Sequence, residues 1–480
     1  MNSEGILRKF SSFSIGPIVG AAINLLTTPV ITYFISPEEY GKASMFTLAL
    51  SIIQLMVFLG MDQAYAKRYY ESEDKSSLFI NAVAPSIILV IVFEVVAYLI
   101  RNSLSTWLFD SSNEVDCVYC LIAIVPALAA ERFLMLGIRM SQRGKLYSAM
   151  TITLKILILV ATVGCLSFFQ KSFRSVIVGT TIAQIIFAFL LWFKQRKELS
   201  INLQKLELNE IYLLLKFGLP LVPTTIIGWI LTGMDKVMLR SMCTYSDLGI
   251  YGVAAKIAAV LTILQTCFTT FWVPLAYQWH SEKKPLSSFT RVGRYVTSVM
   301  SITFLLVIIF RDIIFLLFPS SYNGAKYVVP FLLFTPIMYT ISEVTVMGIY
   351  FNEKTGWTVI VSLASGIVNL CLNTILIPKL GAIGAAIATG FSYITFFWIR
   401  TILSRRIWFN FPLKDYVIVT IVLVTNAFIS SLALVREWGA LMINSASVII
   451  LFLMFRNEIT ELISSALRIL KGLLKENVNN

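Results

Sequence analysis

Long apolar runs recur from one end of this 480-residue sequence to the other. Each run is about as long as the ~20 residues that a helix needs to cross the hydrocarbon core of a bilayer. Only 14% of the residues are charged, whereas an average soluble domain has about 25%. A soluble surface of this size cannot be built from so few charges. The sequence therefore predicts an all-α, polytopic membrane protein with about 14 transmembrane helices, with about 12 helices as the alternative.

An internal repeat suggests how these helices are grouped. Tyr40-Gly41 opens the second predicted span, and Tyr251-Gly252 opens the eighth. The polar pair Glu131-Arg132 in span four corresponds to Ser342-Glu343 in span ten. Many transporters contain such a duplication around a central cavity. The predicted spans are 10–35, 42–64, 78–100, 117–138, 146–169, 174–193, 213–235, 249–273, 293–318, 327–351, 357–378, 383–402, 415–435 and 439–455.

The repeat predicts five regions along the chain. A six-helix bundle occupies 1–193, a cytoplasmic linker 194–212 and a second six-helix bundle 213–402. An extra helix pair follows at 403–456. The segment 457–480 has apolar residues at helical spacing with basic residues between them, so we expect a cytoplasmic amphipathic tail on the membrane surface.

The formal net charge of +13 comes from 39 Lys and Arg residues scattered among short loops. If the N-terminus is cytoplasmic, the larger share of these residues falls in cytoplasmic loops, as the positive-inside rule requires. We therefore expect both termini in the cytoplasm, and the first apolar run to be a retained helix. No long basic run or aromatic platform indicates nucleic acid as a partner.

Ionisable residues inside predicted spans are candidate site residues, because a charge in hydrocarbon costs roughly 3 kcal/mol or more and usually faces a cavity or a partner. The basic candidates for a substrate cavity are Arg132, Lys155, Lys256 and Lys216. Purely structural pairing is the alternative, and Lys216 could instead extend to the membrane surface. The acidic candidates for ion coupling or structural pairs are Glu94, Glu131, Glu343 and Asp235. Glu131 and Arg132 are about 100° apart on a helix, so we expect that they do not both point into one cavity.

Prolines inside spans are candidate hinges, since proline removes a helix hydrogen bond and bends the helix. Pro17 and Pro29 in the first span match Pro220 and Pro223 in the seventh roughly in position. Bends at equivalent places in the two halves would suit alternating access. Static kinks that aid packing are the alternative.

Motifs for catalysis and for cofactors do not appear. The sequence has no G-x-x-x-x-G-K-[ST] phosphate loop. It has a single histidine, which makes a Ser-His-Asp triad improbable. Cys117 and Cys120 form a C-x-x-C without a second ligand pair, so buried apolar cysteine is the better interpretation. We expect a protein that is not an enzyme and uses no metal or other cofactor.

Several stretches resemble the polysaccharide transporter family of lipid-linked oligosaccharide flippases, of the O-antigen type. They are Thr32-Tyr33-Phe34-Ile35-Ser36-Pro37-Glu38-Glu39-Tyr40-Gly41-Lys42-Ala43, Phe217-Gly218-Leu219-Pro220-Leu221-Val222-Pro223, Asp235-Lys236-Val237-Met238-Leu239, and Leu248-Gly249-Ile250-Tyr251-Gly252-Val253-Ala254 followed by Lys256. At Asp235-Lys236 the family commonly has Asp-Arg.

The resemblance implies two six-helix bundles around a V-shaped cavity, the fold of the superfamily that includes drug/sodium antiporters and lipid II flippases. It also implies transport of an undecaprenyl-diphosphate-linked oligosaccharide, such as the O-antigen of lipopolysaccharide, across the bacterial inner membrane. Implied partners are this lipid-linked oligosaccharide, membrane lipids, and the polymerase and chain-length regulator of the pathway. The alternatives are a multidrug or cation antiporter of the same fold and a membrane-embedded polysaccharide polymerase.

Overall fold

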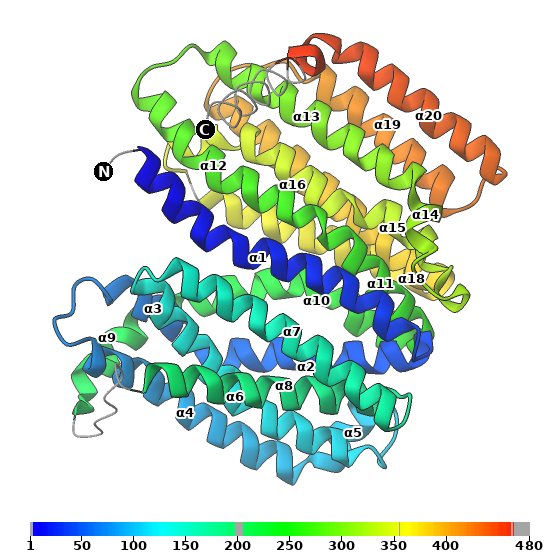
Figure 1. Ribbon diagram of the computed structural model, residues 1–480. Coiled ribbons are helices and arrows are strands. Elements are labelled where there is room, and N and C mark those ends of the chain that lie inside the picture. Colours follow the sequence, from blue (N-terminus) through cyan, green and yellow to red (C-terminus); the bar gives the residue numbers. More distant parts are fainter. Residues whose placement is uncertain (1–2, 197–204, 355, 462–463, 465–480) are drawn as a thin grey trace, which may run out of the picture. The chain divides into compact units, whose positions relative to one another are not determined.

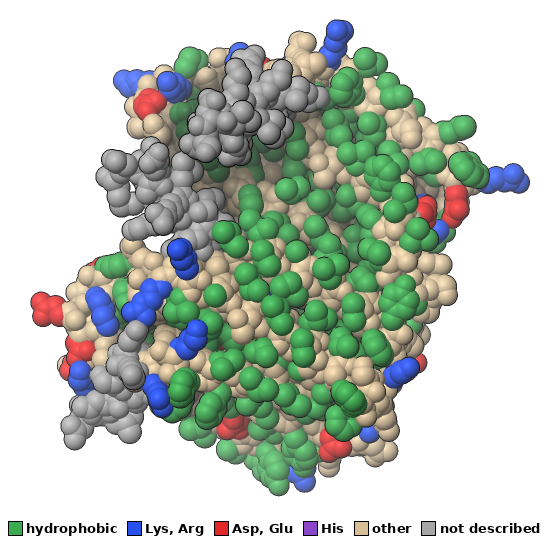
Figure 2. Space-filling model, viewed as in Figure 1, with side chains coloured by type: hydrophobic (Ala, Val, Ile, Leu, Met, Phe, Trp, Pro, Cys, Tyr) green, Lys and Arg blue, Asp and Glu red, His purple; other side chains and the backbone are tan. Residues whose placement is uncertain are grey.

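A computed structural model of the protein describes residues 3–196, 205–354, 356–461 and 464. These residues form helices and no strand. Twelve of the helices within them are long and apolar enough to cross a membrane. Figure 2 shows hydrophobic side chains over most of the face that it presents. The prediction of an all-α, multi-pass membrane protein is confirmed. The number of candidate spanning helices in the described residues is 12, the alternative expectation, and not 14.

The difference from 14 spans arises at two places. Helix α18 (Gly356–Ile407) is 52 residues long and covers two predicted spans, 357–378 and 383–402. It bends at Gly381, whose φ of 54° and ψ of −130° favour glycine. The predicted span 213–235 falls instead on α9 (Leu208–Gly218), the 3₁₀ turn η2 (Leu219–Leu221) and α10 (Val222–Met242).

The helices divide into two compact units, Met1–Gly252 and Val253–Asn480. The first unit contains α9, η2 and α10 and the eight helices that precede them. These are α1 (Ser3–Thr32), α2 (Pro37–Phe58), α3 (Met61–Arg68), α4 (Lys75–Leu99), α5 (Arg101–Phe109), α6 (Val115–Met140), α7 (Gly144–Phe168) and α8 (Phe173–Gln195). Helix α7 packs against α1 and α8, and α8 packs also against α6 (Figure 1). Helix α11 (Tyr245–Ala259) contains the division between the units.

The second unit contains α12 (Leu261–Ser281), α13 (Leu286–Ile309), α14 (Arg311–Phe315), η3 (Ser320–Tyr322), α15 (Ala325–Leu332), α16 (Phe334–Thr345), α17 (Met347–Phe351), α18, α19 (Lys414–Ser431) and α20 (Glu437–Met454). The predicted boundary at the linker 194–212 stays a prediction, and 197–204 of that linker lie outside the described residues. Most of the predicted tail 457–480 also lies outside them.

The hairpin of α19 and α20 is built into the second unit. Helix α13 packs against both of its helices. The buried Arg311 donates a hydrogen bond from Nη1 to the carbonyl oxygen of Ser430, at 2.6 Å. Within the hairpin, Asn426 donates to Ser447 and Asn444 donates to Ser430. These interhelical hydrogen bonds join helices that the hydrophobic effect alone does not hold together in lipid.

Helix starts in the first unit follow local sequence signals. Ser36 caps α2, with Pro37 at its first position and two glutamates in its first turn. Asp74 caps α4 by accepting the backbone N–H groups of Ser76 and Ser77, each at 3.0 Å. Oxygen acceptors at these positions satisfy N–H groups that have no partner within the helix.

The first turns of α2 and α11 approach each other at two glycines. A Cβ atom on Gly41 would lie 2.0 Å from the carbonyl oxygen of Tyr245, and a Cβ atom on Gly249 would lie 1.9 Å from that of Pro37. Any side chain at these positions would overlap the opposite backbone. The glycines in the two family-like stretches thus permit a backbone-to-backbone contact.

Candidate functional site

A polar cavity of about 340 Å³ lies within the first unit. Helices α2, α3, α6 and α7 supply its walls. The lining residues are Gln54, Phe58, Asp62, Gln63, Ala66, Leu128, Glu131, Arg132, Met135, Leu136, Arg139, Tyr147, Thr151, Leu154 and Lys155. Ionisable residues among them place this cavity first among candidate sites, because charges inside a span usually serve a function.

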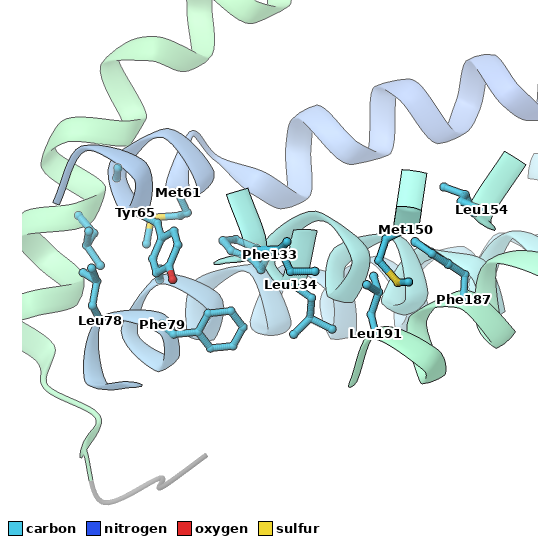
Figure 3. Packing of buried hydrophobic residues seen from close by; sticks show 14 residues of the cluster. Met61, Tyr65, Leu78, Phe79, Phe133, Leu134, Met150, Leu154, Phe187 and Leu191 are labelled. Atoms are coloured by element: carbon cyan, nitrogen blue, oxygen red, sulfur yellow. The ribbon is translucent and has the colours of Figure 1, made fainter. Parts of the chain in front are cut away.

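Helical periodicity selects which residues reach the cavity. Arg132 and Arg139 are two turns apart on α6, so they share one face. The intervening Phe133 and Leu134 point into a buried cluster instead, together with residues of α3, α4, α7, α8 and α9 (Figure 3). Leu154 belongs to both the cluster and the cavity wall. The cluster thus fixes the helices that present the charged side chains.

Arg132 forms an ion pair with Asp62 of α3 across the cavity wall. Its Nε donates to Oδ2 of Asp62 at 3.0 Å, and its Nη2 donates to the same oxygen. The Asp62 side chain is 8% exposed, whereas the Arg132 side chain is 55% exposed. The guanidinium also lies over the ring of Phe58, 5.8 Å from its centroid. The carboxylate is therefore buried, and the cation remains accessible.

Glu131 lines the same cavity as its neighbour Arg132. The two residues are about 100° apart on α6, and the expectation that they do not both point straight into one cavity stays a prediction. Glu131 accepts a hydrogen bond from Nε2 of Gln184, a buried residue of α8. It also lies within electrostatic range of Lys155 and Arg132.

Lys155 and Arg139 are cavity cations that form no ion pair with a described residue. Among the described residues, neither Lys155 nor Arg139 has a carboxylate within 4.0 Å. With Arg132 they make three cations in the lining, against the two carboxylates of Asp62 and Glu131. The cavity carries one net positive charge, so it favours an anion. In the described part of the chain, no three His, Cys, Asp or Glu side chains are grouped to hold a metal.

The other predicted site residues lie outside this cavity. Lys216 is exposed in the last turn of α9, and Lys256 is exposed on α11 in the second unit. Glu94 is half-buried on α4. Asp235 is buried on α10 and accepts a hydrogen bond from the hydroxyl of Tyr251 at 2.7 Å.

Glu343 lies in the core of the second unit. Its Oε1 accepts a hydrogen bond from Nη1 of Arg400 at 2.8 Å, and both residues are 3% exposed. Arg400 also donates to the hydroxyls of Ser342 and Tyr350. Every charge of this pair is compensated within the protein.

The four prolines lie in different local structures in the two predicted halves of the repeat. Pro17 and Pro29 lie inside α1, which continues past both of them. Pro220 lies in η2, where the helix is interrupted, and Pro223 lies at the start of α10. Whether these positions are hinges stays a prediction.

Asp62 and Arg139 are cavity residues that sequence reasoning missed. Both fall at the predicted ends of spans. A charge there is ordinarily exposed to water, so it does not indicate a cavity. Asp62 follows Gly60, which has a φ of 71° and separates α2 from α3. This break turns Asp62 inward, and the glycine at 60 is the signal that could have indicated it.

Comparison with known proteins places the chain among polysaccharide-related membrane proteins. Residues 6–280 match the family described as "Polysaccharide biosynthesis protein". A relative in Haloferax volcanii, "Probable low-salt glycan biosynthesis flippase Agl15", is 21% identical over 388 residues, which cover 79% of each chain.

Two groups of solved structures have a similar fold. The lipid II flippase MurJ, in an inward closed conformation, superposes with a TM-score of 0.70 at 16% identity, covering 93% of this chain and 99% of that one. An inward-facing multidrug resistance transporter of the MATE family gives a TM-score of 0.59 at 14% identity, covering 80% of this chain and 94% of that one. At these identities the likeness concerns the fold alone.

Proposed function

Because this chain belongs to the family of polysaccharide biosynthesis proteins, we propose that it is a flippase for a lipid-linked oligosaccharide. The substrate class is a repeat unit on undecaprenyl diphosphate, such as an O-antigen unit. Transport runs from the inner to the outer leaflet by alternating access. The polysaccharide-related family and the flippase relative support this assignment.

The net positive cavity is the observation that carries the proposal. A diphosphate is anionic, and moving it through hydrocarbon without compensation is very costly. Lys155 and Arg139 offer cations without carboxylate partners among the described residues, and Arg132 offers an accessible guanidinium. Ammonium and guanidinium groups form strong charge-assisted hydrogen bonds with phosphate. The apolar polyprenyl tail can stay in the surrounding lipid while the headgroup occupies the cavity.

The alternative of a cation or multidrug antiporter receives less support from the same cavity. Such a transporter needs a carboxylate that is available to a cation. Asp62 is paired with Arg132, and Glu131 is bonded to Gln184. A membrane-embedded polymerase would need a large external loop, whereas the segment between α4 and α6 consists mainly of the short helix α5.

The flippase proposal includes a location and partners. We place the protein in the bacterial inner membrane with both termini in the cytoplasm, where undecaprenyl-linked units are assembled. The polymerase and the chain-length regulator of the same pathway would then receive its product on the opposite side.

Replacing Lys155 by alanine tests the proposal. In cells that lack the native copy, K155A should lower surface glycan about tenfold, because a lost charge-assisted hydrogen bond costs about 1.5 kcal/mol or more. K155R should restore part of the export. K171A removes the same charge from the turn between α7 and α8, outside the cavity, and should leave glycan unchanged. Normal glycan from K155A at matched protein level would contradict a cationic binding cavity.

A further inference from the structure

Asp62 and Arg132 form an asymmetric pair. The carboxylate occupies one edge of the guanidinium, formed by Nε and Nη2, through a single oxygen. Arg132 has no other hydrogen-bond acceptor among the described residues. Arginine has five N–H donors, so those of Nη1 remain for a ligand. Since the Arg132 side chain is 55% exposed and lines the cavity, this remaining edge is accessible from it.

A second arginine pair in the same unit provides the contrast. Arg174 donates from Nε to Oε2 of Glu114 at 2.6 Å and from Nη2 to Oε1 at 2.8 Å. Both carboxylate oxygens are used, and neither residue lines the cavity. This pair joins the starts of α6 and α8. The two pairs have the same chemistry, but only the pair of Arg132 and Asp62 lines the cavity.

We propose that Asp62 is the resident counter-ion of Arg132 and sets how tightly the cavity holds a diphosphate. This inference rests on the proposed function. Before a diphosphate binds, Asp62 supplies the carboxylate that is hydrogen-bonded to this guanidinium within a span. When a diphosphate binds at the Nη1 edge, Asp62 remains behind the guanidinium. Its negative charge repels the phosphates and keeps the affinity low enough for release. Asp62 is therefore a positioning residue that acts through Arg132.

Affinity for a prenyl diphosphate tests the inference directly. The full-length protein in detergent is titrated calorimetrically with geranyl diphosphate, and geraniol serves as the uncharged control. D62N should bind geranyl diphosphate about tenfold more tightly, equivalent to ~1.4 kcal/mol, because a negative charge leaves the site. The matched control is E114Q, which makes the same change of net charge and also deprives an arginine of its partner. E114Q should bind as the wild type does.

Transport gives a second readout that a merely structural role would not produce. In cells, D62N should export less glycan at matched protein level, although it binds the diphosphate more tightly, because release becomes slow. A structural pair would instead lower stability and leave the affinity of the folded protein unchanged. Unchanged or weaker binding by D62N would overturn the inference, and so would an equal gain of affinity in E114Q.

The double variant D62N/R132Q keeps the test decisive if D62N does not fold. Two amides can replace the ion pair while the net charge of the cavity is preserved. The double variant should bind geranyl diphosphate more weakly than the wild type, since the guanidinium edge is lost. Binding at wild-type strength would show that the pair takes no part in the site. If these binding results are obtained but cells that lack this protein and any substitute flippase still export glycan, the flippase proposal fails while the counter-ion assignment stands.

Discussion

Arg400 and Arg132 both lie within apolar helices and both bond to a carboxylate, but only Arg132 lines a cavity. Arg400 is 3% exposed, and its donors reach Glu343, Ser342 and Tyr350. Breaking a buried pair by removing one partner leaves a charge without compensation and costs about 3–5 kcal/mol. At the scale of the residue, burial therefore separates a structural charge from one that is accessible to a ligand.

We expect R400M to destabilise the protein by about 3 kcal/mol, because it leaves the Glu343 carboxylate buried and unpaired. Thermal unfolding of the purified protein in detergent measures this loss. The control is K284A, which removes an exposed partner of Glu282 at 3.6 Å and should cost less than about 1 kcal/mol. A similar shift in both variants would contradict the structural role of Arg400.

Asp74, outside the spanning helices, gives a pH-dependent contact. A hydrogen bond from the ammonium of Lys205, at 2.7 Å, and the backbone N–H groups of Ser77 and Ser76 lower the pKa of Asp74. A carboxyl whose pKa is lower in the folded protein stabilises it above its unfolded pKa of about 3.9, and this effect is lost as pH falls through the folded pKa. Asp74 and Lys205 thereby hold the segment before α9 to the start of α4 at neutral pH.

We therefore expect proteolysis near residue 205 to accelerate as the pH falls from about 4 toward the lowered pKa of Asp74, where its carboxylate becomes protonated in the folded protein. An acid-active protease applied to the purified protein, followed by mass spectrometry of the fragments, measures the effect. D74N should show the faster cleavage already at pH 5, where the wild type still resists. Equal cleavage of the two proteins at pH 5 would contradict this role of Asp74.

Some site residues could be predicted from the sequence, and others could not. Arg132, Lys155 and Glu131 stand out because they interrupt apolar runs, and they line one cavity. Asp62 and Arg139 do not stand out, since hydropathy cannot distinguish a charge at a helix end that faces water from one that turns inward. That distinction depends on the direction of the helix after Gly60, which is a tertiary property.

At the scale of the element, each half of the repeat shows the same type of contact between helices. Glu131 of α6 bonds to Gln184 of α8, and Glu343 of α16 bonds to Arg400 of α18. The sequence repeat aligns Glu131-Arg132 of α6 with Ser342-Glu343 of α16, so the two acids stand one position apart in it. It did not predict their partners, because Gln184 and Arg400 are not equivalent in the sequence repeat and meet these acids only through packing.

The crossing of α2 and α11 predicts that G41A strongly destabilises the protein, by about 2 kcal/mol or more, since a Cβ would overlap the Tyr245 carbonyl. Thermal unfolding in detergent measures this cost. G164A, in α7, is the matched control, because no atom of another element lies within 4 Å of the position that its Cβ would occupy. It should stabilise the helix by about 0.5 kcal/mol. Wild-type stability of G41A would show that the two helices do not need this close approach.

At the scale of the whole molecule, hydropathy predicted most of the spanning helices because the bilayer imposes their length. It could not predict that two spans join in α18 through Gly381, since a glycine with that backbone conformation is compatible with a loop as well as with a kink. Nor could it predict that α19 and α20 pack within the second unit, because that depends on hydrogen bonds such as the one from Arg311.

The proposed orientation predicts which turns face each side of the membrane. In a chain whose six cysteines are replaced by alanine, K171C should react with a membrane-impermeant maleimide in spheroplasts. K284C should react only after the membrane is permeabilised, because the excess of basic residues places that turn in the cytoplasm. Mass spectrometry of the labelled protein provides the measurement. Labelling of both positions in spheroplasts would contradict the orientation.

Arg311 limits how this protein can be shortened. Its guanidinium is buried and reaches the main chain of Ser430 in the last hairpin. A protein truncated before Lys414 would lose that acceptor and leave the guanidinium without its hydrogen bond to the hairpin, at a cost of about 1–3 kcal/mol. Engineers who seek a version without the last two helices must therefore exchange Arg311 for an apolar residue at the same time. The hairpin of α19 and α20 is therefore an integral part of the second unit.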